Sequence, residues 1–357
     1  MNNETLHKLH NSGVEVYFYG DCVRNAILKI PTNKYTIALI GGTKEKIIES
    51  LKAYEVLDIR TSFIITEGAD TYEFTLFKSI KDLPVRPFTI QNAILKLDGA
   101  LMHGEDILAK EIRVINKDIF FDYPEEMIRA CRLASQLDFK IVVDTWAAIR
   151  DNNRLIKLVI RFKPQIIGQE LEKILATPKP SVGFRYLQST ELLRYIIPPL
   201  ASCEQIIQTR RGDTTNVFEH TMLAVDASEN IPLIRWTVLF HDSGKPQTME
   251  IEEDGKLHFF KHEIVGSKLA EEYMGKYKCE FGIIRDTSLL ITHHMFDADP
   301  KLTIKGVRRL IKRVGPEQIF NLLKVREADR MGSTEIPSMK KIELLRSKIE
   351  KELKGTV

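Results

Sequence analysis

Histidines and aspartates in the C-terminal half of the chain have the types and spacing of metal ligands. Six of the nine histidines fall between residues 220 and 294. Imidazole nitrogens together with carboxylate oxygens suit divalent ions such as Mn, Fe, Ni, Co and Zn. His241 and Asp242 offer one ligand of each kind from adjacent positions, directly after the apolar run 236–240. Because a buried carboxylate without a partner is costly, a bound metal explains this position of Asp242.

The order of these residues is more informative than any one of them. A single histidine is more often a core or surface residue than a ligand, and a lone His-Asp dipeptide indicates little. This chain presents, within about 110 residues, a histidine, the run HDSGK, further histidines and a distal aspartate. The positions are His220, 241–245, His258, His262, the pair 293–294 and Asp329. Such a combination is typical of a metal site.

Residues 220–329 resemble the HD superfamily of metal-dependent phosphohydrolases. The family pattern is a histidine, a His-Asp pair and a distal aspartate, matched here by His220, His241, Asp242 and Asp329. The resemblance implies that these four residues bind a divalent metal. Hydroxide is available on such a metal near neutral pH, because the ion lowers the pKa of bound water.

The remaining histidines resemble the dinuclear subgroup of that superfamily, in which three further imidazoles bind a second metal. The matching residues are His262, His293 and His294, and Asp242 would bridge the two ions. His258 is the alternative to His262, which fits the family segment better. One or two ions of Mn, Ni, Fe, Co or Zn are therefore expected, and Mg is a further option.

The same resemblance assigns catalytic roles to Asp242 and to Lys245 of the HDSGK run. Lys245 would face the substrate phosphate, and Arg308 or Arg309 would help to neutralise charge in the transition state. Together these expectations predict a phosphohydrolase that acts on a phosphate ester of a nucleotide or of an RNA end.

The elements that must position these residues are helices. From Tyr123 onward the apolar pattern is helical, and it begins with the amphipathic segment 125–137. In residues 1–115, short strand patterns alternate with helical ones. Strands are expected at Val14–Tyr19, Tyr35–Ile40, Ile59–Thr66 and Thr71–Lys78, and helices at Cys22–Leu28 and Lys44–Leu51.

Residues 10–340 as a whole resemble the class II nucleotidyltransferases, the bacterial CCA-adding enzymes and poly(A) polymerases that carry a C-terminal HD domain. FYGDCVRN at 18–25 is similar to the family's LVGGxVRD, and KYTIA at 34–38 to its DFDIA. VRPFTIQN at 85–92 is similar to RRDFTINA, and 122–134 to the base-reading EDPLRLLRAxRFA. The resemblance implies an α+β multidomain protein. It would have a small polymerase-beta-like nucleotidyltransferase α/β head (1–120), a helical neck (121–202) and an all-α HD domain with C-terminal helices (203–357).

The head keeps the apolar pattern of that family but lacks its acids. Lys34 and Thr36 stand where the family has two metal-binding aspartates, and Pro87 where it has a further acid. A lysine at such a position repels the Mg²⁺ that nucleotidyl transfer requires. Other acids occur nearby, but none has the alternate spacing on the second strand: Asp21, Asp70, Glu73 and Asp122. We therefore predict a catalytically inactive nucleotidyltransferase head beside an active phosphohydrolase.

Two other functions stay open. One is the addition of CCA or A to tRNA, which the whole-chain resemblance favours and the missing acids oppose. The other is RNA binding without catalysis. Five arginines could contact RNA phosphates or could be paired within the protein. They are Arg24, Arg129 and Arg132 at family positions, and Arg308 and Arg309 in the basic stretch 305–313.

Composition narrows the class of protein. The chain has 357 residues with a formal net charge of +3, and it contains no apolar run of about 18 residues that could span a membrane. Its four cysteines have neither metal nor disulfide spacing. A cytoplasmic protein is expected, with a nucleotide or tRNA-like RNA as substrate and no membrane partner. The sequence indicates no oligomeric state.

Overall fold

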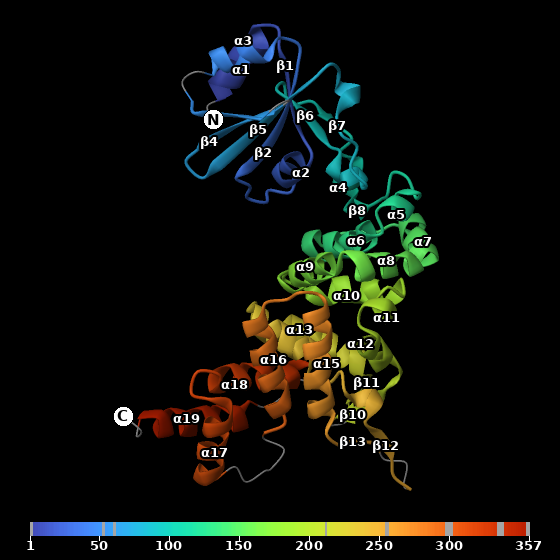
Figure 1. Cartoon of the computed structure of the whole chain (residues 1–357), viewed down its shortest axis with the longest axis vertical. Coiled ribbons are helices and arrows are strands. Elements are labelled where there is room, and N and C mark those ends of the chain that lie inside the picture. Colours follow the sequence, from blue (N-terminus) through green and yellow to red (C-terminus); the bar gives the residue numbers. More distant parts are fainter. Residues whose placement is uncertain are drawn as a thin grey trace. The chain divides into compact units, whose positions relative to one another are not determined.

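A mixed seven-stranded sheet forms the centre of the N-terminal part of the chain (Figure 1). Its order is β3-β4-β5-β2-β1-β6-β7; β2 and β5 are parallel, and the other neighbours are antiparallel. The strands are β1 (Glu15–Tyr19), β2 (Lys34–Ile40), β3 (Val56–Ile59), β4 (Ser62–Glu67), β5 (Asp70–Phe77), β6 (Ile94–Lys96) and β7 (Leu101–Met102). The four predicted strands are confirmed to within a few residues, whereas the short β3, β6 and β7 were not predicted.

The two faces of this sheet differ, because successive side chains of a strand point to opposite sides. On one face Ile37 and Phe74 are fully buried, and they pack with Leu9 and Ile47 from two helices that cover this side (Figure 1). The opposite face is mixed: Tyr17, Ala38 and Ile94 form a small apolar cluster there, and the polar side chains described below lie on the same side. The helices of this part are α1 (Asn3–Asn11), α2 (Asp21–Ile27), α3 (Lys44–Ser50) and α4 (Glu105–Ala109).

The chain forms two units. One comprises Met1–Ile119 with Phe139–Thr145, and the other Phe120–Asp138 with Trp146–Val357. The short strands β8 (Glu111–Ile112) and β9 (Lys140–Ile141) pair in parallel within the first unit. The computed structural model describes residues 3–51, 54–59, 62–210, 213–253, 257–296, 303–333 and 339–354.

The second unit is mainly helical, as predicted. Its helices are α5 (Ile119–Asp122), α6 (Glu125–Leu137), α7 (Val143–Asn152), α8 (Ile156–Phe162), α9 (Pro164–Leu175), α10 (Pro180–Ser189), α11 (Leu193–Ile196), α12 (Pro198–Ser202), α13 (Val217–Ala227), α14 (Pro232–Phe240), α15 (His262–Lys276), α16 (Phe281–His293), α17 (Ile304–Val314), α18 (Ile319–Met331) and α19 (Lys340–Lys354). The expectation of helix alone after residue 203 is wrong at two places. The structure has the antiparallel ribbons β10 (Ile207–Arg210) with β11 (Asp213–Asn216), and β12 (Met249–Ile251) with β13 (Leu257–Phe259). Strands of three or four residues are too short to produce a recognisable two-residue period.

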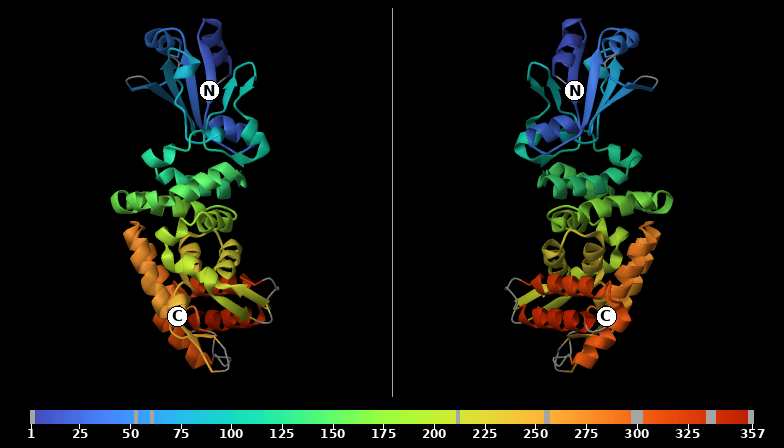
Figure 2. Two further views of the ribbon diagram at one scale, coloured as in Figure 1. Left: turned by 90° about the vertical axis from the view of Figure 1, so that its right-hand side faces the viewer. Right: turned by 90° about the vertical axis from the view of Figure 1, so that its left-hand side faces the viewer.

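Helix α14 is the centre of the histidine-rich region. Its residues from Ile234 to Phe240 are all buried, and it packs against α13, α15, α16 and α18. A helix that is buried on every side fixes its C-terminal end firmly, and the His-Asp pair follows directly at 241–242. The C-terminal helices α17, α18 and α19 pack against one another (Figure 2).

Candidate functional site

Five helices bring six of the predicted ligands together in the second unit. His220 lies in the first turns of α13, and His262 is the first residue of α15. Asp329 lies near the end of α18. His241 and Asp242 follow the last residue of α14, and His294 follows the last residue of α16. All six side chains are buried, and the most exposed, His262, has 6% of its surface accessible.

Each of the four histidines is oriented by a hydrogen bond from its Nδ1 to a backbone carbonyl. His241 bonds Val238 at 2.7 Å, and His262 bonds Phe259 at 2.8 Å. His294 bonds Ile291 at 2.7 Å, and His220 bonds Gly332 at 2.7 Å. A carbonyl only accepts, so Nδ1 carries a proton, and Nε2 is the nitrogen that can present a lone pair to a metal. This arrangement is typical of histidines that ligate metals.

The Nε2 atoms and the carboxylates form two adjoining groups that share Asp242. In the first group, Nε2 of His220 lies 3.0 Å from Asp329 Oδ1 and 3.5 Å from Asp242 Oδ2. Nε2 of His241 lies 3.3 Å from the same Asp242 Oδ2. In the second group, Asp242 Oδ1 is 3.4 Å from Nε2 of His262, and the Nε2 atoms of His262 and His294 are 3.3 Å apart.

This donor set fits a divalent cation. The buried Nε2 of His241 makes no hydrogen bond within the described residues, although carboxylate oxygens of Asp242 and Asp329 lie 3.3 and 3.5 Å away. Burial lowers the pKa of His241, but these two carboxylates outweigh burial and raise the pKa to about 9. Burial and the neighbouring imidazoles lower the pKa of His294 to about 3, which keeps its lone pair available. The first group therefore favours a positive charge, and His294 in the second group offers a neutral nitrogen ligand.

Two basic side chains that are not part of these groups form ion pairs with the carboxylates of Asp242 and Asp329. Lys245 is 2% exposed, and its Nζ lies 2.6 Å from Asp242 Oδ2 and 2.7 Å from Gln208 Oε1. Arg326 forms an ion pair with Asp329 one turn earlier on α18. Sequence reasoning did not find Gln208 or Arg326. The spacing of Arg326 and Asp329 on one helix could have indicated the pair, whereas Gln208 lies in a ribbon that was not expected.

Close packing of α15 against the HDSGK turn sets the distance between His262 and Asp242. A Cβ atom on Gly244 would lie 2.3 Å from the carbonyl oxygen of His262 and 2.7 Å from the backbone nitrogen of Gly266. No side chain fits at that distance, so glycine at 244 allows the approach. The close approach of α15 therefore explains why the HDSGK run has a glycine at this position.

Two of the histidines that were considered as ligands lie elsewhere. His258 is 2.8 Å from Glu252 and stacks on Phe260. His293 is outside both ligand groups of the described residues and lines a separate cavity with Arg309. Consecutive helical residues point about 100° apart, so His293 and His294 at the end of α16 do not face the same site. The expectation that both histidines of this pair bind the second metal does not match the structure.

The face of the sheet that carries Thr36 also carries Glu73, whose position the spacing along one strand could not indicate. Lys34 is exposed at the start of β2, and Thr36 is partly exposed two residues later. The parallel register of β2 and β5 puts Glu73 directly opposite Thr36. Residues that face each other in this way point to the same side of a sheet, so the exposed Glu73 carboxylate lies beside the Thr36 position. No spacing within β2 itself could have indicated this.

Other head residues of the family pattern are held by neighbours. Arg24 is 4% exposed and donates to Asp21 Oδ1 at 2.7 Å and to Asn25. Pro87 is partly buried, and its carbonyl accepts the backbone N–H of Ile115 at 3.0 Å. Both segments therefore keep a fixed backbone despite their altered chemistry.

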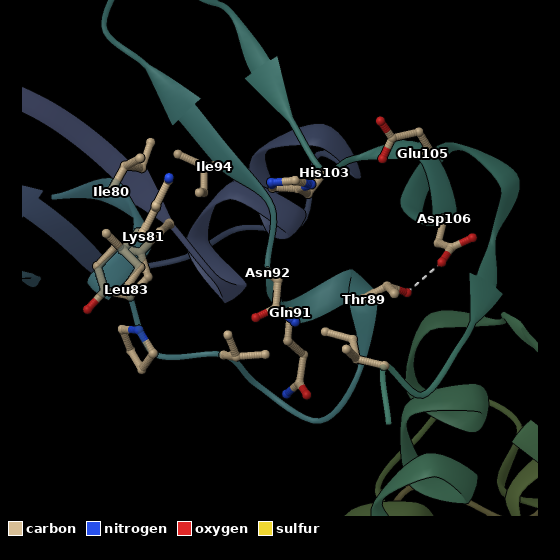
Figure 3. Close-up of a pocket in the computed structure, with 14 residues that line it drawn as sticks. Ile80, Lys81, Leu83, Thr89, Gln91, Asn92, Ile94, His103, Glu105 and Asp106 are labelled. Atoms are coloured by element: carbon tan, nitrogen blue, oxygen red, sulfur yellow. Dashed lines mark hydrogen bonds between the residues drawn. The ribbon is translucent and has the colours of Figure 1, made fainter. Parts of the chain in front are cut away.

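A cavity of about 450 Å³ lies in the first unit, and Figure 3 shows the side chains around it. Tyr19, at the end of β1, belongs to its lining and also lies close enough to Glu73 for that carboxylate to help raise the pKa of the tyrosine, although burial is the main cause. Thr89 donates to Asp106 at 2.5 Å on another side of the cavity. None of the predicted site residues lines it.

The arginines of the segment 122–134 are paired within the protein. Arg129 forms ion pairs with Glu126 and Glu170, and Arg132 donates to Glu170 at 2.6 Å. Glu126 and Glu170 are 6% and 2% exposed. Of the two alternatives left open for these arginines, the structure shows the paired state, and contact with an RNA phosphate stays a prediction.

Two family models match the chain between residues 138 and 332. Residues 138–204 match a model described as the probable RNA and SrmB-binding site of polymerase A, and residues 215–332 match the HD domain. An A-adding tRNA nucleotidyltransferase of Deinococcus radiodurans is 26% identical over 317 residues, which cover 83% of this chain and 70% of that protein. The chain is thus similar to CCA-adding enzymes and poly(A) polymerases with a C-terminal HD domain, as its motifs indicated.

Other relatives agree with this assignment. A CCA-adding enzyme of Pediococcus pentosaceus is 30% identical over 215 residues, covering 53% of this chain and 54% of that protein. The chain thus spans about half the length of this relative. The crystal structure of the Bacillus stearothermophilus CCA-adding enzyme with CTP superimposes with a TM-score of 0.65 and 19% identity. The superposition covers 98% of this chain and 81% of the Bacillus stearothermophilus chain. The predicted class II fold is confirmed, with an α/β head and a helical remainder.

These relatives correct the predicted function. The expectation of a phosphohydrolase with an inactive nucleotidyltransferase head is wrong, because the relatives named above are nucleotide-adding enzymes. They favour the alternative of CCA or A addition. The error arose in the head, where Glu73 and the other nearby acids were set aside because none has the alternate spacing on the strand that carries Lys34 and Thr36. That criterion ignores the pairing between strands. The HD region itself is present, and its buried histidines and aspartates have the geometry of divalent-metal ligands.

Among the described residues, no helix combines the length and the apolar character that crossing a membrane requires.

Proposed function

We propose that this chain is a tRNA nucleotidyltransferase, which adds nucleotides from ATP or CTP to the 3′ end of a tRNA. The observation that carries the proposal is the extent of the similarity to the Deinococcus radiodurans enzyme. It covers 83% of the chain, whereas residues 120–357 make up only about two thirds of it, so the similarity extends into the head. An enzyme related through the HD region alone would not share that part.

The face of the sheet that carries Thr36 and Glu73 supports the same proposal. Nucleotidyl transfer needs carboxylates that hold Mg²⁺ on the triphosphate and near the attacking hydroxyl group. We propose that Glu73 supplies one such carboxylate beside Thr36, with which it is in register. Asp21, exposed just beyond the end of β1, is the second candidate. Lys34 and Thr36 are proposed to be former acid positions, whose loss slows the reaction.

The test is incorporation of labelled ATP and CTP into tRNA with Mg²⁺. Glu73→Gln removes the carboxylate charge with little change of shape. Asp70→Asn is a matched control, because Asp70 lies three residues away on β5 and therefore on the opposite face of the sheet. We expect Glu73→Gln to lower kcat by about 100-fold or more, the scale of a lost transition-state contact, and Asp70→Asn to change it less than twofold.

Two results would contradict the proposal. Wild-type protein that binds tRNA without adding any nucleotide would support an RNA-binding protein without catalysis. Equal activity of Glu73→Gln and wild type would leave nucleotide addition in place but remove Glu73 from it.

We further propose that the buried groups of the second unit bind one or two divalent transition-metal ions. His220, His241 and Asp329 would hold one ion, and His262 and His294 the other, with Asp242 between them. Mn, Ni, Fe, Co and Zn all suit imidazole and carboxylate ligands, and Mg suits them less well. Such an ion would act as a Lewis acid and lower the pKa of bound water. Lys245 would keep the Asp242 carboxylate charged and in place.

Elemental mass spectrometry of purified wild type and Asp242→Ala tests this site. We expect one to two transition-metal ions per wild-type chain and clearly fewer in the variant. Absence of metal from wild type, even after incubation with Mn²⁺ or Ni²⁺, would refute it. In this proposal residues 1–120 form the nucleotidyltransferase head, 121–202 an RNA-binding neck and 203–357 the HD domain.

A further inference from the structure

The separate cavity that His293 lines is rich in positive charge. It has a volume of about 370 Å³ and lies where the end of α16 and the start of α15 meet α17. His293 and Thr292 come from α16, and Arg309 and Arg313 come from α17. Among the described residues of the lining, Glu263 is the one with an acidic side chain, and one of its oxygens lies 3.6 Å from Nδ1 of His262. Two guanidinium groups thus face one carboxylate.

Arg309 and Arg313 are four residues apart and therefore project from the same side of α17. Neither makes an ion pair or a hydrogen bond within the described part of the chain. Arg308, the neighbour of Arg309, differs, because its guanidinium forms an ion pair with Glu352 of α19. The structure therefore separates two arginines that the sequence presents as equivalent: one is engaged within the protein and the other faces the cavity.

The rest of α17 extends this charge along one surface. The helix carries five basic residues and no acidic one, while its apolar side, with Val307, Leu310 and Val314, is buried. A row of cations on an exposed helix face suits a polyanion better than a single small ion, because every neutralised phosphate releases counterions. The cavity supplies a fixed position on that surface.

We propose that the cavity formed by His293, Arg309 and Arg313 binds a backbone phosphate of the RNA substrate. Guanidinium groups donate paired hydrogen bonds that match phosphate oxygens. Phosphate contacts of this kind position RNA without reading its sequence. That the phosphate belongs to tRNA rests on the proposed function; the cationic site itself does not.

The experiment measures binding of full-length protein to a tRNA by fluorescence anisotropy between 50 and 300 mM KCl (roughly the range in which counterion effects are resolved). The test variant is Arg309→Gln with Arg313→Gln, and the comparison variant is Arg308→Gln. All three arginines are exposed, so the folds should be equally stable. We expect the double variant to bind tRNA about tenfold or more weakly, the size of at least one charge-assisted hydrogen bond. The slope of log K against log salt should fall by about one to two. Arg308→Gln should change the affinity less than twofold.

Several outcomes would overturn the inference. Equal losses in Arg308→Gln and in the double variant would indicate a diffuse basic surface without a built site. If ATP or inorganic phosphate bound wild type but not the double variant while tRNA affinity stayed unchanged, the site would serve a free phosphate group instead of RNA.

Failure of the proposed function can be distinguished from failure of this site. Incorporation of ATP, measured on the same variants, should show a raised KM for tRNA with kcat unchanged. A wild type that adds no nucleotide but shows the expected difference in tRNA binding would refute the function and leave the phosphate site standing.

Discussion

The pairing of Asp242 with Lys245 allows folding and metal binding to be separated by experiment. The two charged atoms are 2.6 Å apart, and both side chains are buried. At an effective dielectric constant of about 20 they attract each other by roughly 6 kcal/mol. Asp242→Ala would leave the ammonium group of Lys245 buried, with its hydrogen bond to Gln208 as partial compensation. We therefore expect metal-free Asp242→Ala to lose about 3–5 kcal/mol of unfolding free energy.

A second substitution should restore the unfolding free energy without restoring metal binding. In Asp242→Ala with Lys245→Met no stranded ammonium group remains, so stability should return to within about 1–2 kcal/mol of wild type. Because Asp242 contributes to both ligand groups, metal content should stay low in the single and in the double variant.

The assay is urea unfolding of chelator-treated protein, followed by tryptophan fluorescence. Trp236 lies in α14, is 1% exposed and reports on the helices around the site. The chain has two tryptophans, so replacing Trp146 by Phe in all variants leaves Trp236 as the single tryptophan whose fluorescence is measured. The reasoning fails if the double variant is as unstable as Asp242→Ala, or if either variant retains the metal content of wild type.

Three further predictions concern the two sites. Lys34→Asp with Thr36→Asp should increase nucleotide incorporation by tenfold or more (about 1.4 kcal/mol of barrier), because two carboxylates would then join Glu73; a decrease in kcat would count against the proposed face. Gly244→Ala should cost about 3 kcal/mol in urea unfolding and reduce metal content, since its Cβ would lie 2.3 Å from a backbone oxygen; wild-type stability would show that this packing can relax. His262→Ala should reduce the metal content measured by elemental mass spectrometry, whereas His258→Ala should leave it unchanged; the reverse order would show that the second ion uses different ligands.

The sequence allowed most of the buried cluster of histidines and aspartates to be predicted, because the residue types and their order along the chain form the pattern. The sequence could not show that His294 joins the cluster while His293 does not, because two consecutive residues at the end of a helix differ only in the direction of their side chains. The same limit applies to Arg308 and Arg309. Direction depends on how each helix packs, and helix packing depends on the whole fold.

The head shows a different limit of sequence reasoning. Strand positions were predicted well, because hydrophobic alternation is a local property. The pairing of β2 with β5 is not local, and it alone places Glu73 beside Thr36. A criterion based on spacing along one strand therefore set aside an acid that the neighbouring strand brings beside Thr36.

The hydrogen bonds that orient the four imidazoles also imply an order of assembly. His241, His262 and His294 bond a carbonyl three residues earlier, so a single local turn can aim each of them before distant segments meet. His220 instead bonds Gly332, 112 residues later, at the end of the helix that carries Asp329. The imidazoles of His241, His262 and His294 can thus be oriented before α18 docks, whereas His220 is oriented only after it has docked. A metal ion bound there would link α18, through Asp329, to ligands whose orientation is set locally, and would thereby stabilise the docking of the C-terminal helices.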